Sequence, residues 1–152
     1  MGYIFGMNFK GEFEVKKDRP TVSAFVSDIE KVTSVIPDVQ SVERIDKTSS
    51  RLVVKAGQSA IKGKFNLLLK VKNRIDDQSV EISAKGSGAT GSLNLKATYD
   101  FSDSTNGATL VKWNVEITIG GVIATMGSRV INNTAEKYIS VLTDSFREAF
   151  EK

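Results

Sequence analysis

The last thirty residues, from Gly121 to Phe150, constrain the fold more than any other part of the sequence. Apolar residues recur there at spacings of three, four and seven positions, which is the pattern of a helix with one apolar face. These residues are Ile123, Met126, Val130, Ile131, Tyr138, Leu142, Phe146 and Ala149. Charged and amide side chains occupy the opposite side. We therefore expect one long amphipathic helix over residues 121–150.

The preceding sequence alternates between apolar and polar residues, which is typical of strands with one face on a core. We expect a first strand over 3–15, then a short helix that Asp18 caps and a second short helix over 28–35. Six more strands are expected near 39–46, 51–57, 63–74, 79–86, 91–101 and 109–119. The strand near 39–46 does not alternate cleanly, so its register stays open.

Short turns separate successive strands, and strands joined in this way form an antiparallel meander. The sequence therefore predicts an α+β fold: a seven-stranded curved antiparallel sheet, two short helices after the first strand, and a long C-terminal helix across the sheet. The length predicts a single domain, residues 1–152. Such a fold is able to hold a ligand between helix and sheet. Small Ala84 and Ala97 stand among large inward-facing residues, so the sequence leaves the volume of any cavity open.

The composition excludes several classes of site. Neither cysteine nor histidine occurs, which excludes disulfides, thiolate nucleophiles, the usual zinc sites and histidine-based triads. The net charge of +3 is too small to predict nucleic-acid binding, and we expect none. No apolar run is long enough to cross a bilayer, and there is no recognisable signal peptide. We therefore expect a cytoplasmic protein.

Four segments carry a specific resemblance: Ile36 to Glu43, Ile61 to Phe65, Gly86 to Ser92 and Ile119 to Arg129. Through them the chain resembles the G subunit of the aerobic carbon-monoxide dehydrogenase system across essentially its whole length. The resemblance implies the helix-grip fold, which is shared with steroidogenic-regulatory lipid-transfer domains and the major birch-pollen allergen. This agrees with the order of elements derived above.

The resemblance also implies a function. It implies an accessory subunit that helps a molybdenum hydroxylase-type dehydrogenase reach the membrane, with a quinone or another apolar ligand in the pocket and no metal or catalytic motif. Some members continue past the long helix into a hydrophobic anchor, whereas this sequence ends at Lys152. We therefore expect any peripheral contact with the inner face of the membrane to come from the surface of the domain or from a partner.

The inward-facing strand positions are almost free of ionisable groups; Tyr99 is the exception. Together with Tyr138 and the Trp113 indole, it provides the polar groups of the predicted pocket that could hydrogen-bond a ligand. An environment of this kind suits an apolar ligand held by one or two hydrogen bonds, or else an ordinary core. The predicted ligand-binding residues are Phe65, Leu67, Ile82, Leu95, Tyr99, Trp113, Met126 and Tyr138.

Residues 86–91 match the G-x-G-x-x-G pattern of dinucleotide-binding loops. That pattern needs a following helix, and the next segment alternates as a strand, so we reject nucleotide binding. Counting strand reversals places 57–62, 86–91 and 119–122 at one end of the sheet. This end is rich in glycine, and we predict a mobile gate there, although the glycines also serve simply as turn residues. The predicted gate residues are Gly86, Gly88, Gly91, Gly120, Gly121 and Ile123.

Three functions remain open from the sequence. The first is a non-catalytic protein that binds an apolar ligand or recruits a carbon-monoxide dehydrogenase-type enzyme to the membrane. The second is a small helix-grip enzyme acting on an aromatic or polyketide-like substrate; a charged residue displaced into the pocket, such as Asp100 or Arg129, would favour it. The third is an interaction protein with a filled core. Neither the ligand nor the oligomeric state follows from the sequence.

Overall fold

The computed structural model describes residues 4–58 and 61–151, which form the predicted α+β architecture. Seven antiparallel strands make one sheet in the order β1-β7-β6-β5-β4-β3-β2, so β5 is its central strand. The strands are β1 (Ile4–Val15), β2 (Val39–Arg44), β3 (Ser49–Gln58), β4 (Ile61–Ile75), β5 (Ser79–Gly88), β6 (Gly91–Asp103) and β7 (Thr109–Gly120). The α-helices are α1 (Arg19–Val26), α2 (Ile29–Ser34) and α3 (Ser128–Glu151), and two short 3-10 helices are η1 (Thr105–Gly107) and η2 (Val122–Thr125).

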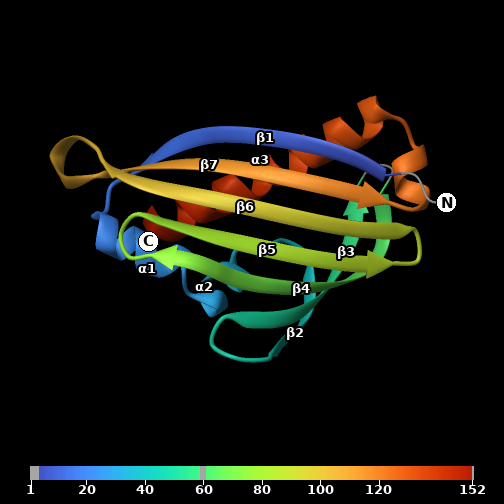
Figure 1. Ribbon diagram of the computed structural model, residues 1–152, viewed down its shortest axis with the longest axis horizontal. Helices are drawn as coiled ribbons and strands as arrows, with labels where there is room; N and C mark the ends of the chain where they lie inside the picture. The colour runs from blue at the N-terminus through green and yellow to red at the C-terminus, as the bar shows by residue number, and fades with distance from the viewer. Residues whose placement is uncertain (1–3, 59–60, 152) are drawn as a thin grey trace.

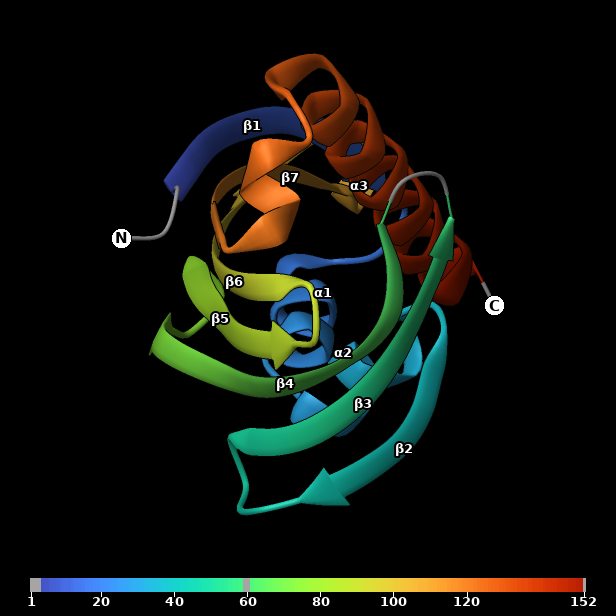
Figure 2. The same cartoon turned by 90° about the vertical axis from the view of Figure 1, so that its right-hand side faces the viewer.

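The sheet is strongly curved, and α3 lies across its concave side (Figure 1). Seen end-on, the sheet wraps around α1 and α2, and α3 spans the open side between β1 and β3 (Figure 2). Alternation explains why the helices cover one face: most strands turn every second side chain toward that face, and the two faces of the sheet therefore differ in polarity. The edge strand β2, which is largely exposed, is an exception. Along the end of β6, for example, Ala97, Tyr99 and Phe101 are buried, whereas Lys96 and Asp100 are exposed.

The long helix is shorter than the sequence predicts. It begins at Ser128, not near 121, because residues Val122–Thr125 form η2 and Gly127 has a φ of +96°. This left-handed backbone conformation separates η2 from α3, so the helical spacing counted from residue 121 does not carry over into α3. As a result Val130 lies on the solvent side, whereas Ile131 is completely buried.

Side-chain caps begin both short helices, as expected for aspartate at these positions. The Thr21 amide donates to Asp18 Oδ1 at 2.9 Å, and the Glu30 amide donates to Asp28 Oδ1 at 3.0 Å. These hydrogen bonds satisfy amide groups that a helix leaves unpaired at its start. The hydrogen bonds with Thr21 lower the pKa of the Asp18 carboxyl.

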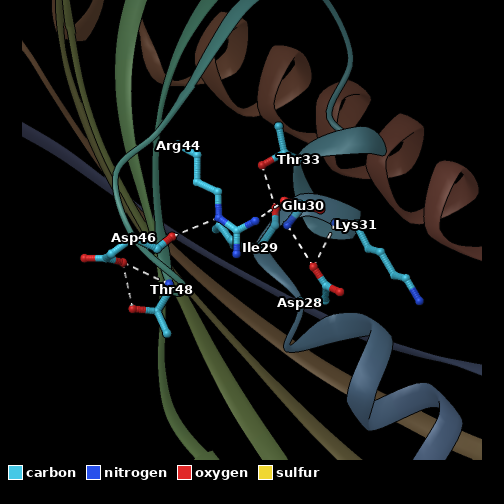
Figure 3. A network of polar contacts seen from close by, with 8 residues as sticks. All are labelled: Asp28, Ile29, Glu30, Lys31, Thr33, Arg44, Asp46 and Thr48. Carbon is cyan, nitrogen blue, oxygen red and sulfur yellow. Dashed lines mark hydrogen bonds and ion pairs between the residues drawn. The ribbon is translucent and has the colours of Figure 1, made fainter.

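A polar network joins α2 to the hairpin of β2 and β3 (Figure 3). Arg44 forms an ion pair with Glu30 and donates from Nε to the Asp46 carbonyl oxygen at 3.2 Å. The connection between α2 and β2 then turns at Asp38, which has a φ of +62° and whose carbonyl accepts from the Lys55 amide at 3.0 Å. This turn holds the preceding Ile36-Pro37 pair against the concave side of the sheet, where both residues line the site described next.

Candidate functional site

A pocket of about 230 Å³ lies between the concave face of the sheet and the first half of α3. Its floor comes from alternate residues on four strands: Val54 on β3, Phe65 and Leu67 on β4, Leu93 and Leu95 on β6, and Ile117 and Ile119 on β7. Strand pairing brings these residues together, since Leu93 lies opposite Ile119 and Leu95 lies opposite Ile117. Distant parts of the chain therefore share one apolar surface.

The roof of the pocket is one face of α3. Ile131, Thr134 and Ala135 contribute the first turn of this face, and Tyr138, Ile139 and Leu142 contribute the next two. The spacing of three and four residues places them on the same side of the helix. The Thr134 hydroxyl donates to the Val130 carbonyl at 2.9 Å, so its hydrogen is directed to the helix itself.

The lining is almost entirely apolar. Among the described lining residues, polar side chains come from Ser92, Thr134 and Tyr138, and none is a carboxylate, lysine or arginine. Asp100 and Arg129, the charged residues that would have favoured an enzyme, are both exposed and do not line the pocket. Within residues 4–58 and 61–151 no group of acidic side chains is arranged to hold a metal ion. Such a site favours binding of an apolar molecule over acid–base chemistry.

Four of the predicted ligand-binding residues line this pocket: Phe65, Leu67, Leu95 and Tyr138. Four others do not: Ile82, Tyr99, Trp113 and Met126. Ile82 and Tyr99 face inward but lie away from the pocket. Ile82 pairs with Ala97 and Tyr99 pairs with Val80, whereas the pocket residues Leu95 and Leu93 pair with Ala84 and Gly86. Both are buried in the core, and burial raises the pKa of Tyr99 to about 12.

Trp113 and Met126 need separate explanations. Trp113 pairs with Gly11 on β1, and a β-carbon added at Gly11 would lie 2.5 Å from Trp113 Cζ2, so the indole ring covers this glycine instead of the pocket. Met126 ends η2 just before the Gly127 break, where its amide donates to the Ile123 carbonyl at 3.1 Å. Helical spacing from α3 therefore does not apply to it.

Sequence reasoning missed several lining residues. Ile36 and Pro37 lie in a connection whose path only the tertiary structure defines, although they belong to a segment that carried the family resemblance. Val54 belongs to β3, for which no inward register was assigned. Thr134, Ala135 and Ile139 complete the helical face once the helix starts at Ser128. They were missed because Thr134 is polar, Ala135 is small and Ile139 was not included in the predicted apolar stripe.

The glycine-rich end has the predicted position but not the predicted loop. The pairings of Gly88 with Gly91 and of Ser92 with Gly120 place the β5–β6 turn beside the end of β7. In the other segment predicted at this end, 57–62, residues 59–60 lie outside the described residues. Gly86 and Gly88 belong to β5, so the turn itself contains only Ala89 and Thr90. The predicted flexible loop is therefore wrong in extent, because strand pairing continues to Gly88.

Close backbone contacts hold η2 against this turn. The Ile123 amide donates to the Thr90 carbonyl at 3.0 Å. A β-carbon at Gly91 would lie 2.4 Å from the Gly120 carbonyl oxygen, and one at Gly121 would lie 2.8 Å from Gly91 Cα. Glycine is therefore required for these segments to touch. The contact seats Ile123, which is buried and lines the end of the pocket. A gate at this end stays a prediction.

Comparisons with known proteins agree with this architecture. The family model for CoxG, the G subunit of carbon monoxide dehydrogenase, matches residues 11–150. A conserved protein from Geobacillus kaustophilus is similar in structure, with a TM-score of 0.85, 21% identity and 95% of each chain covered. A START superfamily protein from Mycobacterium smegmatis has a TM-score of 0.69 at 14% identity, covering 95% of this chain and 97% of the other.

A plant enzyme shares the same fold more distantly. Norcoclaurine synthase from Thalictrum flavum has a TM-score of 0.64 at 9% identity, covering 98% of this chain and 88% of the enzyme. Identities this low establish the fold alone. No curated protein matches the chain in sequence. Among the described helices, none combines the length and the apolar character that crossing a bilayer requires.

Proposed function

The chain belongs to the CoxG family of carbon monoxide dehydrogenase, and from that premise we propose that it is a non-catalytic accessory protein that binds an apolar ligand between the sheet and α3. The observation that carries this proposal is the pocket of about 230 Å³, whose described lining has no charged side chain. A filled core would have no such hollow, and protein interiors normally leave few voids of this size.

The ligand class follows from the lining. Burial of apolar surface contributes about 25 cal/mol for each Å² removed from water, so affinity here depends on apolar area. Tyr138 and the rim residue Ser92 provide hydroxyl groups for a small number of polar contacts. We therefore propose a ligand with a largely apolar body and at most one or two polar groups, of which a quinone is one example.

The family membership supports a redox enzyme as the partner. We propose that the protein serves a carbon monoxide dehydrogenase-type molybdenum hydroxylase, either by carrying its apolar ligand or by recruiting it to a membrane surface. The test is copurification of the dehydrogenase with a tagged chain from cells that produce both. Recovery of the tagged chain without any dehydrogenase would contradict this partner but would leave ligand binding standing.

An enzymatic role has less support. Norcoclaurine synthase has the same fold, but a catalyst of this kind needs an acid or base close to its substrate. In the described lining Tyr138 is the one titratable side chain. Binding without turnover is the simpler function of this pocket.

Ligand binding is tested by filling the pocket from α3. Ala135→Phe places a ring in the pocket, whereas Ser140→Phe adds the same ring at an exposed position of the same helix that does not line the pocket. We expect the apolar dye phenylnaphthylamine to bind the wild type, and we expect Ala135→Phe to weaken binding by at least about tenfold. Ser140→Phe should bind like the wild type. Equal binding by both variants would place the dye elsewhere and contradict the proposed site.

The natural ligand is then identified directly. Native mass spectrometry of protein purified from its own host, followed by extraction of lipids and quinones, should show a bound apolar molecule that is absent from Ala135→Phe. If only ligand-free protein is recovered and no apolar probe binds it, the proposed function is wrong.

A further inference from the structure

We propose that Gly86 determines how deep the pocket is, and therefore how long an apolar chain it accepts, although Gly86 does not line the pocket. This inference rests on the proposed function, because it concerns the selectivity of the same site. It begins with a gradient in side-chain size along β5, the central strand of the sheet.

The inward positions of β5 become smaller toward the pocket from Ile82 onward. From the filled end to the hollow end they are Val80, Ile82, Ala84, Gly86 and Gly88. The pocket lies over the small end, and no residue of β5 is among its lining. Neighbouring strands keep large residues at the same level, since Gly86 lies between Leu67 on β4 and Leu93 on β6. The missing side chains of β5 therefore create room in the middle of the floor.

Leu67 uses part of this room. It is the pairing partner of Gly86, and a β-carbon added at Gly86 would lie 2.3 Å from Leu67 Cδ2. The Leu67 side chain thus occupies the place in which a side chain at position 86 would stand. Because Leu67 also lines the pocket, empty space lies on its other side. A larger residue at position 86 would push Leu67 into the pocket and make it shallower.

Gly86 acts on the pocket more selectively than Gly88 does. At Gly86 the nearest atom to an added β-carbon is the end of a flexible side chain, and the nearest backbone atom is the Asn66 carbonyl oxygen at 3.4 Å. At Gly88 the nearest atom is the Lys64 carbonyl oxygen at 2.6 Å, so a substitution there would move the sheet itself. Gly86 also has no left-handed φ, so alanine fits its backbone conformation. Gly86→Ala therefore changes the pocket and keeps the fold.

The chain offers a matched control for this substitution. Gly6 lies on β1 and is exposed, and the nearest atom to a β-carbon there is the Ile117 carbonyl oxygen at 4.0 Å. Gly6→Ala is the same chemical change in the same kind of strand backbone, without contact to the pocket. Any general effect of replacing a strand glycine by alanine appears in both variants.

The experiment measures chain-length selectivity. Primary alkanols of about six to about fourteen carbons are titrated against bound phenylnaphthylamine for the wild type, Gly86→Ala, Gly6→Ala, and the double variant Gly86→Ala with Leu67→Ala. We expect Gly86→Ala to prefer shorter alkanols and to lose about fourfold in affinity for each methylene that no longer fits. Gly6→Ala should match the wild type. The double variant should accept long alkanols again, because it lacks the Leu67 methyl groups that alanine at position 86 displaces.

The outcomes separate this inference from the proposed function. If the wild type binds neither dye nor alkanol, the proposed function fails; crystal structures of the wild type and Gly86→Ala still test whether Leu67 turns into the pocket. If the wild type binds and Gly86→Ala has the same chain-length profile, the inference about Gly86 is wrong. If Gly86→Ala does not fold but the double variant folds and binds, the contact between positions 86 and 67 is confirmed. If neither folds, backbone contacts determine this position and the inference is overturned.

Discussion

The two halves of α3 pack against the same sheet but meet different interiors. The C-terminal half meets a filled, aromatic core, in which Phe25 and Phe150 have ring centroids 4.6 Å apart and Phe146 lies 6.2 Å from Phe25 and 6.0 Å from Tyr99. The N-terminal half covers the pocket, whose walls are mostly aliphatic. In Figure 1 the C-terminal half lies toward α1, and the N-terminal half lies toward the β5–β6 turn.

The difference arises from what opposes the helix at each end. At the filled end, α1 inserts Val22 and Val26 into the core, and the inward residues of β5 are Val80 and Ile82. At the hollow end the short helix η2 contributes the single buried residue Ile123, and β5 presents glycine. A single helix has one apolar stripe, which is too narrow to fill a concave sheet unaided. The comparison teaches that tight packing and empty volume lie at opposite ends of one core.

The largest effect is expected at the filled end. Phe146→Ala should lower the free energy of unfolding by about 3 to 5 kcal/mol, because it removes a buried ring from tight contacts. Leu142→Ala, one turn earlier and on the wall of the pocket, should cost less than about 2 kcal/mol, since Leu142 already borders empty space. Urea unfolding of both variants checks this. Equal losses would mean that the two ends are packed alike.

The second comparison uses the same residue type in both regions. Ile82 on β5 and Ile117 on β7 are similarly buried, at 4% and 6% exposure, but only Ile117 lines the pocket. We expect Ile82→Ala to lower the free energy of unfolding by about 3 kcal/mol or more, and Ile117→Ala to lower it by about 2 kcal/mol or less. Ile117→Ala should also tighten the binding of longer alkanols, which Ile82→Ala should not do. A larger loss of stability for Ile117→Ala would reverse our assignment of the two regions.

A third prediction concerns alkaline pH at the filled end. Burial raises the pKa of Tyr99 to about 12 from an ordinary value of 10.0, so the unfolded chain releases this proton before the folded protein does. The corresponding stability is present below about pH 10 and is lost as the pH rises toward about 12, to a limit of about 3 kcal/mol. Tyr99→Phe should lack this part of the pH dependence in unfolding measurements. Identical pH profiles for the two proteins would show that water reaches Tyr99 and that this end is less dry than its packing indicates.

The smallest effect is expected outside both regions, at the ion pair of Arg44 with Glu30. Both side chains are largely exposed, so Glu30→Gln should change the free energy of unfolding by no more than about 1 kcal/mol. It should also leave dye binding unchanged, because the nearby Ile36 and Pro37 are positioned by the backbone turn at Asp38. Weaker dye binding in this variant would show that the pocket depends on the polar network in Figure 3.

Much of the fold was predictable from local patterns. Alternation predicted the strands and the inward face, and the Asp18 cap predicted where the first short helix begins. The glycine-rich segment 86–91 did not predict where β5 ends, because pairing continues to Gly88. The start of α3 was not predictable in this way, because apolar spacing runs from η2 into the helix without interruption. Only the left-handed conformation of Gly127 shows that the two segments are separate.

The candidate site was less predictable than the fold. Phe65, Leu67 and Leu95, predicted by alternation, and Tyr138, predicted by helical spacing, line the pocket. Ile82 and Tyr99 satisfy the same alternation but lie in the filled core. Alternation reports which face a side chain is on, and it has no information about what stands opposite. Trp113 illustrates the limit, because its position over Gly11 depends on pairing between strands about a hundred residues apart.

The sequence by itself determined the order of elements, the inward register of the clear strands and an apolar, uncharged concave face, because these depend on periodicity within single segments. It also contained the decrease in side-chain size from Ile82 to Gly88, but it did not show that a pocket lies over the small end. Only the tertiary structure decided where that face is hollow. Empty volume is set by the sizes of side chains that meet across strands and helices, such as Leu67 opposite Gly86 or Phe25 against Phe150, and those meetings exist only in the folded chain.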